Sequence, residues 1–374
     1  DGEVVLGPSE VATFAGTSLT LAANGLAGST SHAVRVDGSG LDLASLAIGS
    51  DVNGVRVDGD ARIDGDLVVG SSGFLSYADV NVVGGAVIGG PARFLGTGDQ
   101  VLRVGAGETL ELGGALTSKS TDGKLSLDAD RIELTAIGAQ TIESRFGKLE
   151  IGSAAGTGLV RGSFDAAGAP DPAGARGDLT LRGSAVDGTG PAITVHGTRT
   201  LGDGRSYALA LANGDLLVDA RAIASETNAT PGPATWAADG DVLAYGDVDL
   251  RGRGALAGGA ADYAITARRF GTSATTLRGG ELRIGGIASV DGDLALRADG
   301  DAPTALIPDP SAIFLGGEFD LAHDLVVSGT TATSADLEIR AAGDVVFESR
   351  VRGTGDLSVE SEGRIDLQSD VALS

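Results

Sequence analysis

The sequence predicts an all-β protein, and three observations carry that prediction. A Gly-Asp pair followed by a branched aliphatic residue and an alternating apolar pattern recurs eight times. Short runs that alternate apolar and polar residues are frequent, as in strands with one buried side. The chain has 61 Gly, 9 Phe, 4 Tyr, 1 Trp, no Cys and no Met, so its core must be aliphatic. The Gly-Asp segments are GDLVV at 65–69, GDLTL at 177–181, GDLLV at 214–218, GDVLA at 240–244, GDVDL at 246–250, GDLAL at 292–296, GDVVF at 343–347 and GDLSV at 355–359.

Each repeat combines a corner with a short strand. Glycine suits a corner that is cramped or needs a positive φ, and the residues after it point alternately inward and outward. The same alternation places Val, Leu, Ile and Phe on one face in 55–69, 102–112, 124–134 and 336–349. Because such strands bury only one side, their apolar faces must meet in a shared interior.

Two architectures supply such an interior, a parallel solenoid and an antiparallel sandwich or barrel. Asp-Gly pairs, as at 37–38 and 291–292, favour hairpin turns and keep the sandwich open as an alternative. The unbroken repetition over 374 residues favours the solenoid, in which each coil contacts only its neighbours. We therefore expect a right-handed parallel β-helix of roughly 12–19 coils, with about 20 to 30 residues in each coil.

No linker divides the pattern, so we expect one elongated domain over residues 1–374. Three proline-bearing segments break the strand rhythm and are expected to leave the rod as loops. They are 163–176, 225–240 and 299–312. Proline in such loops removes no hydrogen bond from a strand ladder.

The net charge of the chain limits the classes of partner that it can bind. It has 51 acidic and 27 basic residues, a formal net charge of −24, which argues against nucleic-acid binding. No apolar run approaches the roughly 18 residues of a transmembrane helix. Most Asp residues stand beside Gly, where they form turns and protect strand edges. The alternative is that corner Asp residues bind Ca²⁺, for which DGSGLDLAS at 37–45 is the best match. No other cofactor is expected.

Repeated GDLxL and GxIxL units in a Gly-, Ala- and Asp-rich chain without Cys resemble filamentous-haemagglutinin-like exoproteins and autotransporter-adhesin passengers. That resemblance implies a β-helical structural or adhesive protein, secreted to the bacterial cell surface as a shaft or filament subunit. The final segment GDLSVESEGRIDLQSDVALS at 355–374 keeps the strand rhythm to its last residue without an evident cap, so we expect self-association end to end through unpaired strand edges. A glycan or cell-surface receptor is the other expected partner. The Asn-Pro-Asn signature of the secretion domain is absent.

Catalytic motifs are missing from the sequence, so we expect no enzyme. His32, His196 and His323 stand singly, and no G-x-S-x-G joins a strand to a helix. The alternative is a secreted polysaccharide lyase or hydrolase, or a calcium-dependent glycan-binding adhesin, on the same scaffold. Asp247, Asp249 and Arg251 share one face of a strand and are the carboxylate and arginine set that such an enzyme would use. A solvated charge ladder explains them equally simply.

Two places in the chain are candidates for binding. Trp236 lies in the proline-bearing segment 225–240 with Tyr245 nearby, which suggests an aromatic contact patch. Arg176, Gly177 and Asp178 spell the integrin-binding tripeptide next to the segment 163–176. Because Gly-Asp opens strands throughout the chain, chance also accounts for this tripeptide.

Overall fold

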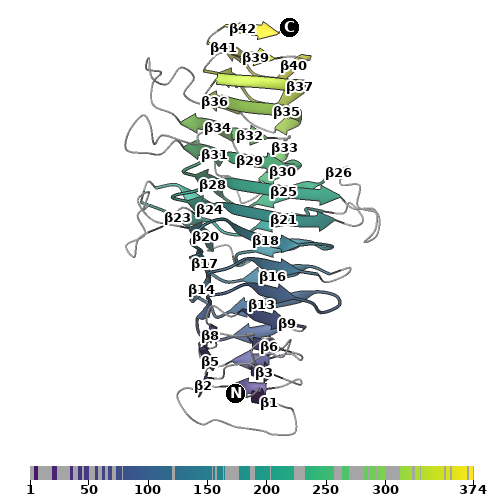
Figure 1. Cartoon of the computed structure of the whole chain (residues 1–374). Coiled ribbons are helices and arrows are strands. Elements are labelled where there is room, and N and C mark those ends of the chain that lie inside the picture. The colour runs from purple at the N-terminus through teal and green to yellow at the C-terminus, as the bar shows by residue number, and fades with distance from the viewer. Residues whose placement is uncertain are drawn as a thin grey trace.

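The structure is a computed structural model of the whole chain, and part of the chain is placed well enough to describe. The described residues are 4–6, 19–22, 34–36, 41–43, 46–49, 55–57, 61–63, 66–69, 73–77, 79–119, 123–153, 155, 158–162, 164, 177–185, 190–202, 204–222, 232–256, 263–268, 282–284, 287–290, 294–299, 312–321, 325–328, 330–348, 351–353, 356–368 and 370–373. They form a rod of stacked coils with the two termini at opposite ends (Figure 1).

Each coil contributes one strand to each of three ladders, which we call faces 1, 2 and 3 in chain order. Face 1 comprises β1 (Val4–Leu6), β3 (Val34–Val36), β6 (Val55–Val57), β9 (Phe74–Ser76), β12 (Ala92–Phe94), β15 (Leu116–Ser118), β18 (Gln140–Ser144), β21 (Leu179–Ala185), β25 (Leu216–Ala222), β29 (Val248–Arg251), β32 (Leu282–Ile284), β39 (Val351–Gly353) and β42 (Val371–Leu373). Face 2 comprises β4 (Leu41–Leu43), β7 (Ala61–Ile63), β10 (Val80–Val82), β13 (Gln100–Val104), β16 (Leu125–Asp128), β19 (Leu149–Ile151), β22 (Ile193–Val195), β27 (Thr235–Ala238), β30 (Arg253–Leu256), β33 (Ile287–Val290) and β40 (Leu357–Ser361).

Face 3 is a separate sheet. It comprises β2 (Leu19–Ala22), β5 (Leu46–Gly49), β8 (Leu67–Val69), β11 (Ala86–Ile88), β14 (Thr109–Leu112), β17 (Arg131–Leu134), β20 (Leu159–Gly162), β24 (Ser206–Leu211), β28 (Asp241–Ala244), β31 (Tyr263–Arg268), β34 (Leu294–Asp299), β36 (Leu325–Ser328), β38 (Val345–Phe347) and β41 (Ile365–Leu367). Two long strands, β35 (Ala312–Leu321) and β37 (Thr330–Ala341), run through both face 1 and face 2 and join them into one sheet.

The predicted parallel β-helix is confirmed. All strand pairs of the three ladders are parallel, and the fourteen strands of face 3 fall within the predicted range of coils. Among the described residues the antiparallel pairs are β23 (Arg199–Thr200) with β24 and β26 (Gly232–Pro233) with β25. No helix occurs in the described part of the chain, and so none there could span a membrane.

The core is a column of aliphatic side chains along the rod axis. On face 3, Leu67, Ala86, Leu110 and Ile132 lie one above the other in register, and all are buried. The residues between them in each strand face outward, as Glu111 and Glu133 do. Strand alternation therefore separates an aliphatic interior from a charged exterior.

The repeated segments stack directly on one another. GDLTL, GDLLV and GDVDL occupy successive coils of face 1, with Leu179 paired to Leu216 and Leu216 to Val248. GKLSL at 123–127 lies under GKLEI at 147–151 on face 2 in the same way. Glycine is needed in these segments because the preceding coil passes too close for a side chain. A Cβ built on Gly147 would lie 1.5 Å from the carbonyl oxygen of Gly123.

The structure differs from the expected loop at 225–240. Of its described residues, Gly232–Pro233 form β26 and Thr235–Ala238 form β27, which is a rung of face 2. The prolines beside it led to the loop prediction, but Pro233 lies in a two-residue antiparallel strand, where a missing N–H is tolerated. Most of the other two predicted loops, 163–176 and 299–312, lies outside the described residues, as does most of the proposed calcium motif at 37–45.

Candidate functional site

The corner aspartates of the Gly-Asp repeats bind the coil that follows them. Asp178 Oδ1 accepts the backbone N–H of Asp215 at 3.0 Å, and Asp215 Oδ1 accepts the backbone N–H of Asp247 at 3.0 Å. Asp66 accepts the N–H of Gly85 and Asp344 that of Arg364 in the same manner. One carboxylate oxygen is thus used to hold the next coil in register.

This arrangement accounts for two of the three residues of the Arg-Gly-Asp tripeptide. Gly177 and Asp178 belong to the corner stack, where the carbonyl oxygen of Gly177 would lie 2.3 Å from a Cβ on Gly214. Arg176 lies outside the described residues. The described part of the tripeptide therefore has a structural role in stacking.

The two aromatic candidates lie apart in the fold. Trp236 is 2% exposed and points into the core, where Gly254 of the next coil leaves room for its ring. Tyr245 follows β28 and is partly buried in a small cluster on the outside of face 3, with Leu159, Tyr207 and Leu243. The structure does not bring Trp236 and Tyr245 together into a surface patch. Trp236 points inward from face 2, whereas Tyr245 lies on the outside of face 3.

Asp247, Asp249 and Arg251 do not form an unpaired carboxylate pair. The backbone N–H of Asp247 takes part in the corner stack, and Asp249 Oδ2 accepts hydrogen bonds from Nε and Nη2 of Arg251, at 2.9 and 2.7 Å. Glycosidases need two carboxyl groups facing one bond. The side chains of Asp249 and Arg251 instead form an ion pair with each other.

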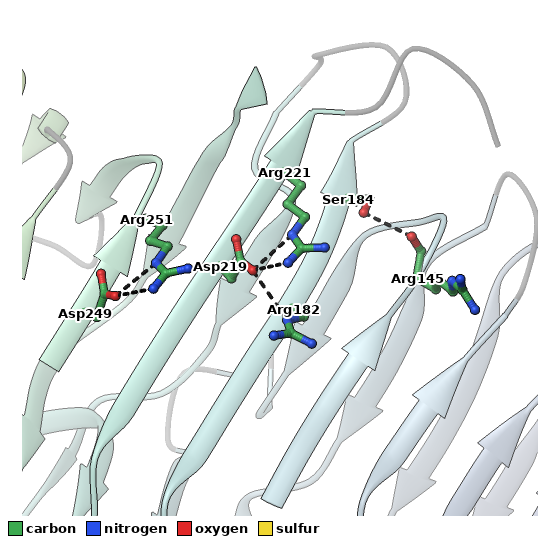
Figure 2. A network of polar contacts seen from close by, with 7 residues as sticks. All are labelled: Arg145, Arg182, Ser184, Asp219, Arg221, Asp249 and Arg251. Carbon is green, nitrogen blue, oxygen red and sulfur yellow. Dashed lines mark hydrogen bonds and ion pairs between the residues drawn. The ribbon is translucent and has the colours of Figure 1, made fainter. Parts of the chain in front are cut away.

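Arg251 belongs to a larger network on the outside of face 1 (Figure 2). Asp219 lies between Arg182 of the coil below and Arg251 of the coil above. Its Oδ2 accepts hydrogen bonds from Arg221 and lies 3.4 Å from Nε of Arg182. Burial alone would raise the pKa of Asp219, but the bond from Arg221 and the charges of Arg221, Arg182 and Arg251 hold that pKa below its ordinary value. Asp219 is therefore ionised and holds the surrounding guanidinium groups.

A hydrogen-bonded pair of His196 and Asp239, which we call the histidine pair, lies where face 2 turns toward face 3. His196 Nδ1 is 2.9 Å from Asp239 Oδ2, one coil above. This hydrogen bond raises the pKa of His196 against the opposing effect of burial, and the charges of Asp239, Glu150 and Asp128 act in the same direction as the bond. This pair was not predicted from the sequence, because His196 and Asp239 are far apart in the chain.

A second buried acid, Asp241, lies on the outside of face 3. Asp241 accepts hydrogen bonds from Nε of Arg205 at 2.5 Å and from the backbone N–H of Ala264 at 2.7 Å. Burial raises the pKa of Asp241 although both bonds and the charges of Arg205 and Arg297 favour the ionised form. Its bond to Ala264 joins adjacent coils, so its position is explained by stacking.

Among the described residues, no group of three or more His, Asp or Glu is arranged to hold a metal ion. No protein family, curated protein or solved structure matches this chain. The functional conclusion therefore depends on the architecture and on the surface of the rod.

Proposed function

We propose that this chain is an extracellular structural protein of the bacterial cell surface, a β-helical shaft that projects or spaces other components. The observation that carries the proposal is the single hydrophobic core that runs through successive coils from Leu67 to Val351. A rod of this kind gains length by adding coils, because each coil contacts only its neighbours. The resemblance of its repeats to filamentous-haemagglutinin-like exoproteins supports the same role.

The proposal includes stacking of rods through the coil formed by β40, β41 and β42. Ile365 and Leu367 are 45% and 44% exposed there, whereas their partners in the coil below, Val345 and Phe347, are buried. Within the described residues these three strands pair on one side only. In the purified 374-residue chain, such an edge above exposed apolar side chains favours addition of another coil.

Localisation tests the shaft directly. Antibodies against the rod are expected to label the outside of intact cells that produce the protein, in immunogold electron microscopy. Labelling only after the cells are permeabilised would contradict the proposal.

Stacking is tested with the purified chain. Ile365→Lys with Leu367→Lys is expected to reduce end-to-end rods in negative-stain images and the sedimentation coefficient at high protein concentration. Val68→Lys is the matched control. Val68 is 40% exposed on β8 of face 3, where it points outward from the side of the rod and not from the coil of β40 to β42. Wild-type rods that stay single at all concentrations would rule out stacking.

A further inference from the structure

The outward side of face 1 carries a local excess of positive charge, which we call the arginine patch. It lies on β18, β21, β25, β29 and β32, and its charged residues are Arg145, Arg182, Arg221, Arg251 and Arg283 with Glu143, Asp219 and Asp249. Acids outnumber bases by 51 to 27 in the whole chain, whereas these positions carry five arginines against three acids, with the corner residues Asp178, Asp215 and Asp247 along one edge.

Strand register brings these residues together. Glu143, Arg182, Asp219 and Arg251 form one column across four coils, and Ser184 and Arg221 are paired in the next column. The hydroxyl of Ser184 donates to the backbone carbonyl of Arg145, which follows β18. Because rungs of a β-sheet are about 4.8 Å apart, neighbouring coils bring these arginine-bearing positions close together on one side of the rod.

The acids of the patch occupy only part of the donor capacity of these arginines. A guanidinium has five N–H donors. Arg221 uses Nε and Nη2 on Asp219, and Arg251 uses the same two groups on Asp249. Arg145 lies with its guanidinium 5.3 Å from the ring of Phe146 and is exposed. Donors for an external anion thus remain at several points of the patch.

The surface around these groups indicates what kind of partner fits. Protein interfaces are built around a buried apolar or aromatic centre, and Leu217 is the large apolar residue among the outward positions described on these strands. Phe146, which stacks with Arg145, is the aromatic residue described beside the patch, and the outward strand positions themselves carry none.

We propose that the arginine patch binds a linear acidic polysaccharide through its carboxylate groups. The polysaccharide lies along the rod axis, so that its successive carboxylates meet arginines of successive coils. Arginine favours carboxylates because its planar fork donates two parallel hydrogen bonds. The stacked corner residues Asp178, Asp215 and Asp247 lie at the beginnings of the same strands and bound the patch on that side. This inference concerns only the side of the rod, so its failure leaves the proposed shaft standing.

Affinity electrophoresis of the 374-residue chain in gels containing polygalacturonate tests the proposal. The triple variant Arg145→Gln, Arg251→Gln, Arg283→Gln removes three exposed arginines and leaves Arg182 and Arg221 to hold Asp219. Its apparent affinity at 0.15 M salt is expected to fall about tenfold or more. The control triple Arg93→Gln, Arg103→Gln, Arg364→Gln removes exposed arginines elsewhere on the rod and is expected to keep the wild-type affinity.

Further arms separate carboxylate recognition from simpler explanations. Equal retardation by neutral dextran or by DNA, or equal loss in the control triple, would overturn the proposal. So would full binding by the variant Arg145→Lys, Arg251→Lys, Arg283→Lys, which keeps the charge but loses the fork. Self-association that depends on the patch, without retardation by polygalacturonate, would assign the surface to a second copy instead. Circular dichroism and melting temperature confirm that each variant is folded.

Discussion

Asp215 links three coils. Its backbone N–H donates to the carboxylate of Asp178 in the coil below, and its own carboxylate accepts the backbone N–H of Asp247 in the coil above. Its role depends on the glycine before it. The Gly214 φ of +147° and the close carbonyl of Gly177 exclude a side chain at that position. The Gly-Asp pair is thus a unit in which glycine permits the contact and aspartate makes the hydrogen bond.

Asp215→Ala is expected to lower the free energy of unfolding by about 1–2 kcal/mol, because the N–H of Asp247 loses a charged acceptor. Asp215→Asn is expected to lose less, since its amide oxygen still accepts. Urea denaturation measures both values. Asp249→Ala is the control on the neighbouring coil, where a partly exposed ion pair contributes about 1 kcal/mol or less. Equal losses in all three variants would contradict the corner role.

His196 gives the rod a pH-dependent contact. Its pKa is raised above 6.5 in the folded protein, so its contribution is fully present below the unfolded pKa and is lost as the pH rises through the folded value. The free energy of unfolding of wild type minus that of His196→Gln is therefore expected to be larger at pH 5.5 than at pH 9. Urea titrations at the two pH values measure this difference. A difference that is the same at both would contradict the role of the pair with Asp239.

At the scale of elements, the sequence predicts which strands exist and which of their residues face inward. Alternation alone separates Leu110 and Leu112 from Glu111. It fails at β27, where flanking prolines suggested a loop around Trp236. The inward position of that residue becomes evident only from its pairing with Ile193 and Gly254 in adjacent coils.

The match between Trp236 and Gly254 is testable. A Cβ at residue 254 would lie 2.4 Å from Cζ2 of Trp236 and 2.7 Å from Cδ1 of Ile287. Gly254→Ala is expected to lower the free energy of unfolding by about 1–3 kcal/mol through overpacking. The same change should cost less in a Trp236→Phe background, because phenylalanine lacks the ring that carries Cζ2. A double-mutant cycle measured by thermal melting provides the coupling, and strictly additive losses would rule out this contact as the cause.

Pairing between coils also explains why the arginine patch and the histidine pair could not be predicted. To predict which residues of one face become neighbours, one must know the number of residues in each coil. That number varies along the chain. Ala86 pairs with Leu67, whereas Leu209 pairs with Val160 much further back in the chain. The repeats fix the strands, but the segments between them set which surface residues become neighbours.

For the whole molecule, stability is a sum over coils and the contacts between neighbouring coils. Coils in the middle, such as those of β16 to β25, have buried partners on both sides, whereas Ile365, Leu367 and Val371 are exposed. In the purified 374-residue chain, opening is therefore expected to be easier at β40 to β42 than in the middle coils.

Hydrogen–deuterium exchange followed by mass spectrometry measures this gradient. Amides of β40 to β42 are expected to exchange faster than those of β18 and β21 under native conditions. Uniform protection along the rod would instead indicate a single cooperative unit. The variant Ile365→Lys, Leu367→Lys should leave the exchange of β18 and β21 unchanged.

The pairing of Val160 with Leu209 has a practical consequence for engineering. Between β20 and β24 the chain contributes β21 to face 1 and β22 to face 2, and it returns to face 3 in register although this coil has many more residues than the one from Leu67 to Ala86. Residues added between the strands of this coil are therefore expected to leave the rungs above it in register, which makes the coil a suitable place to graft an epitope or a reporter domain.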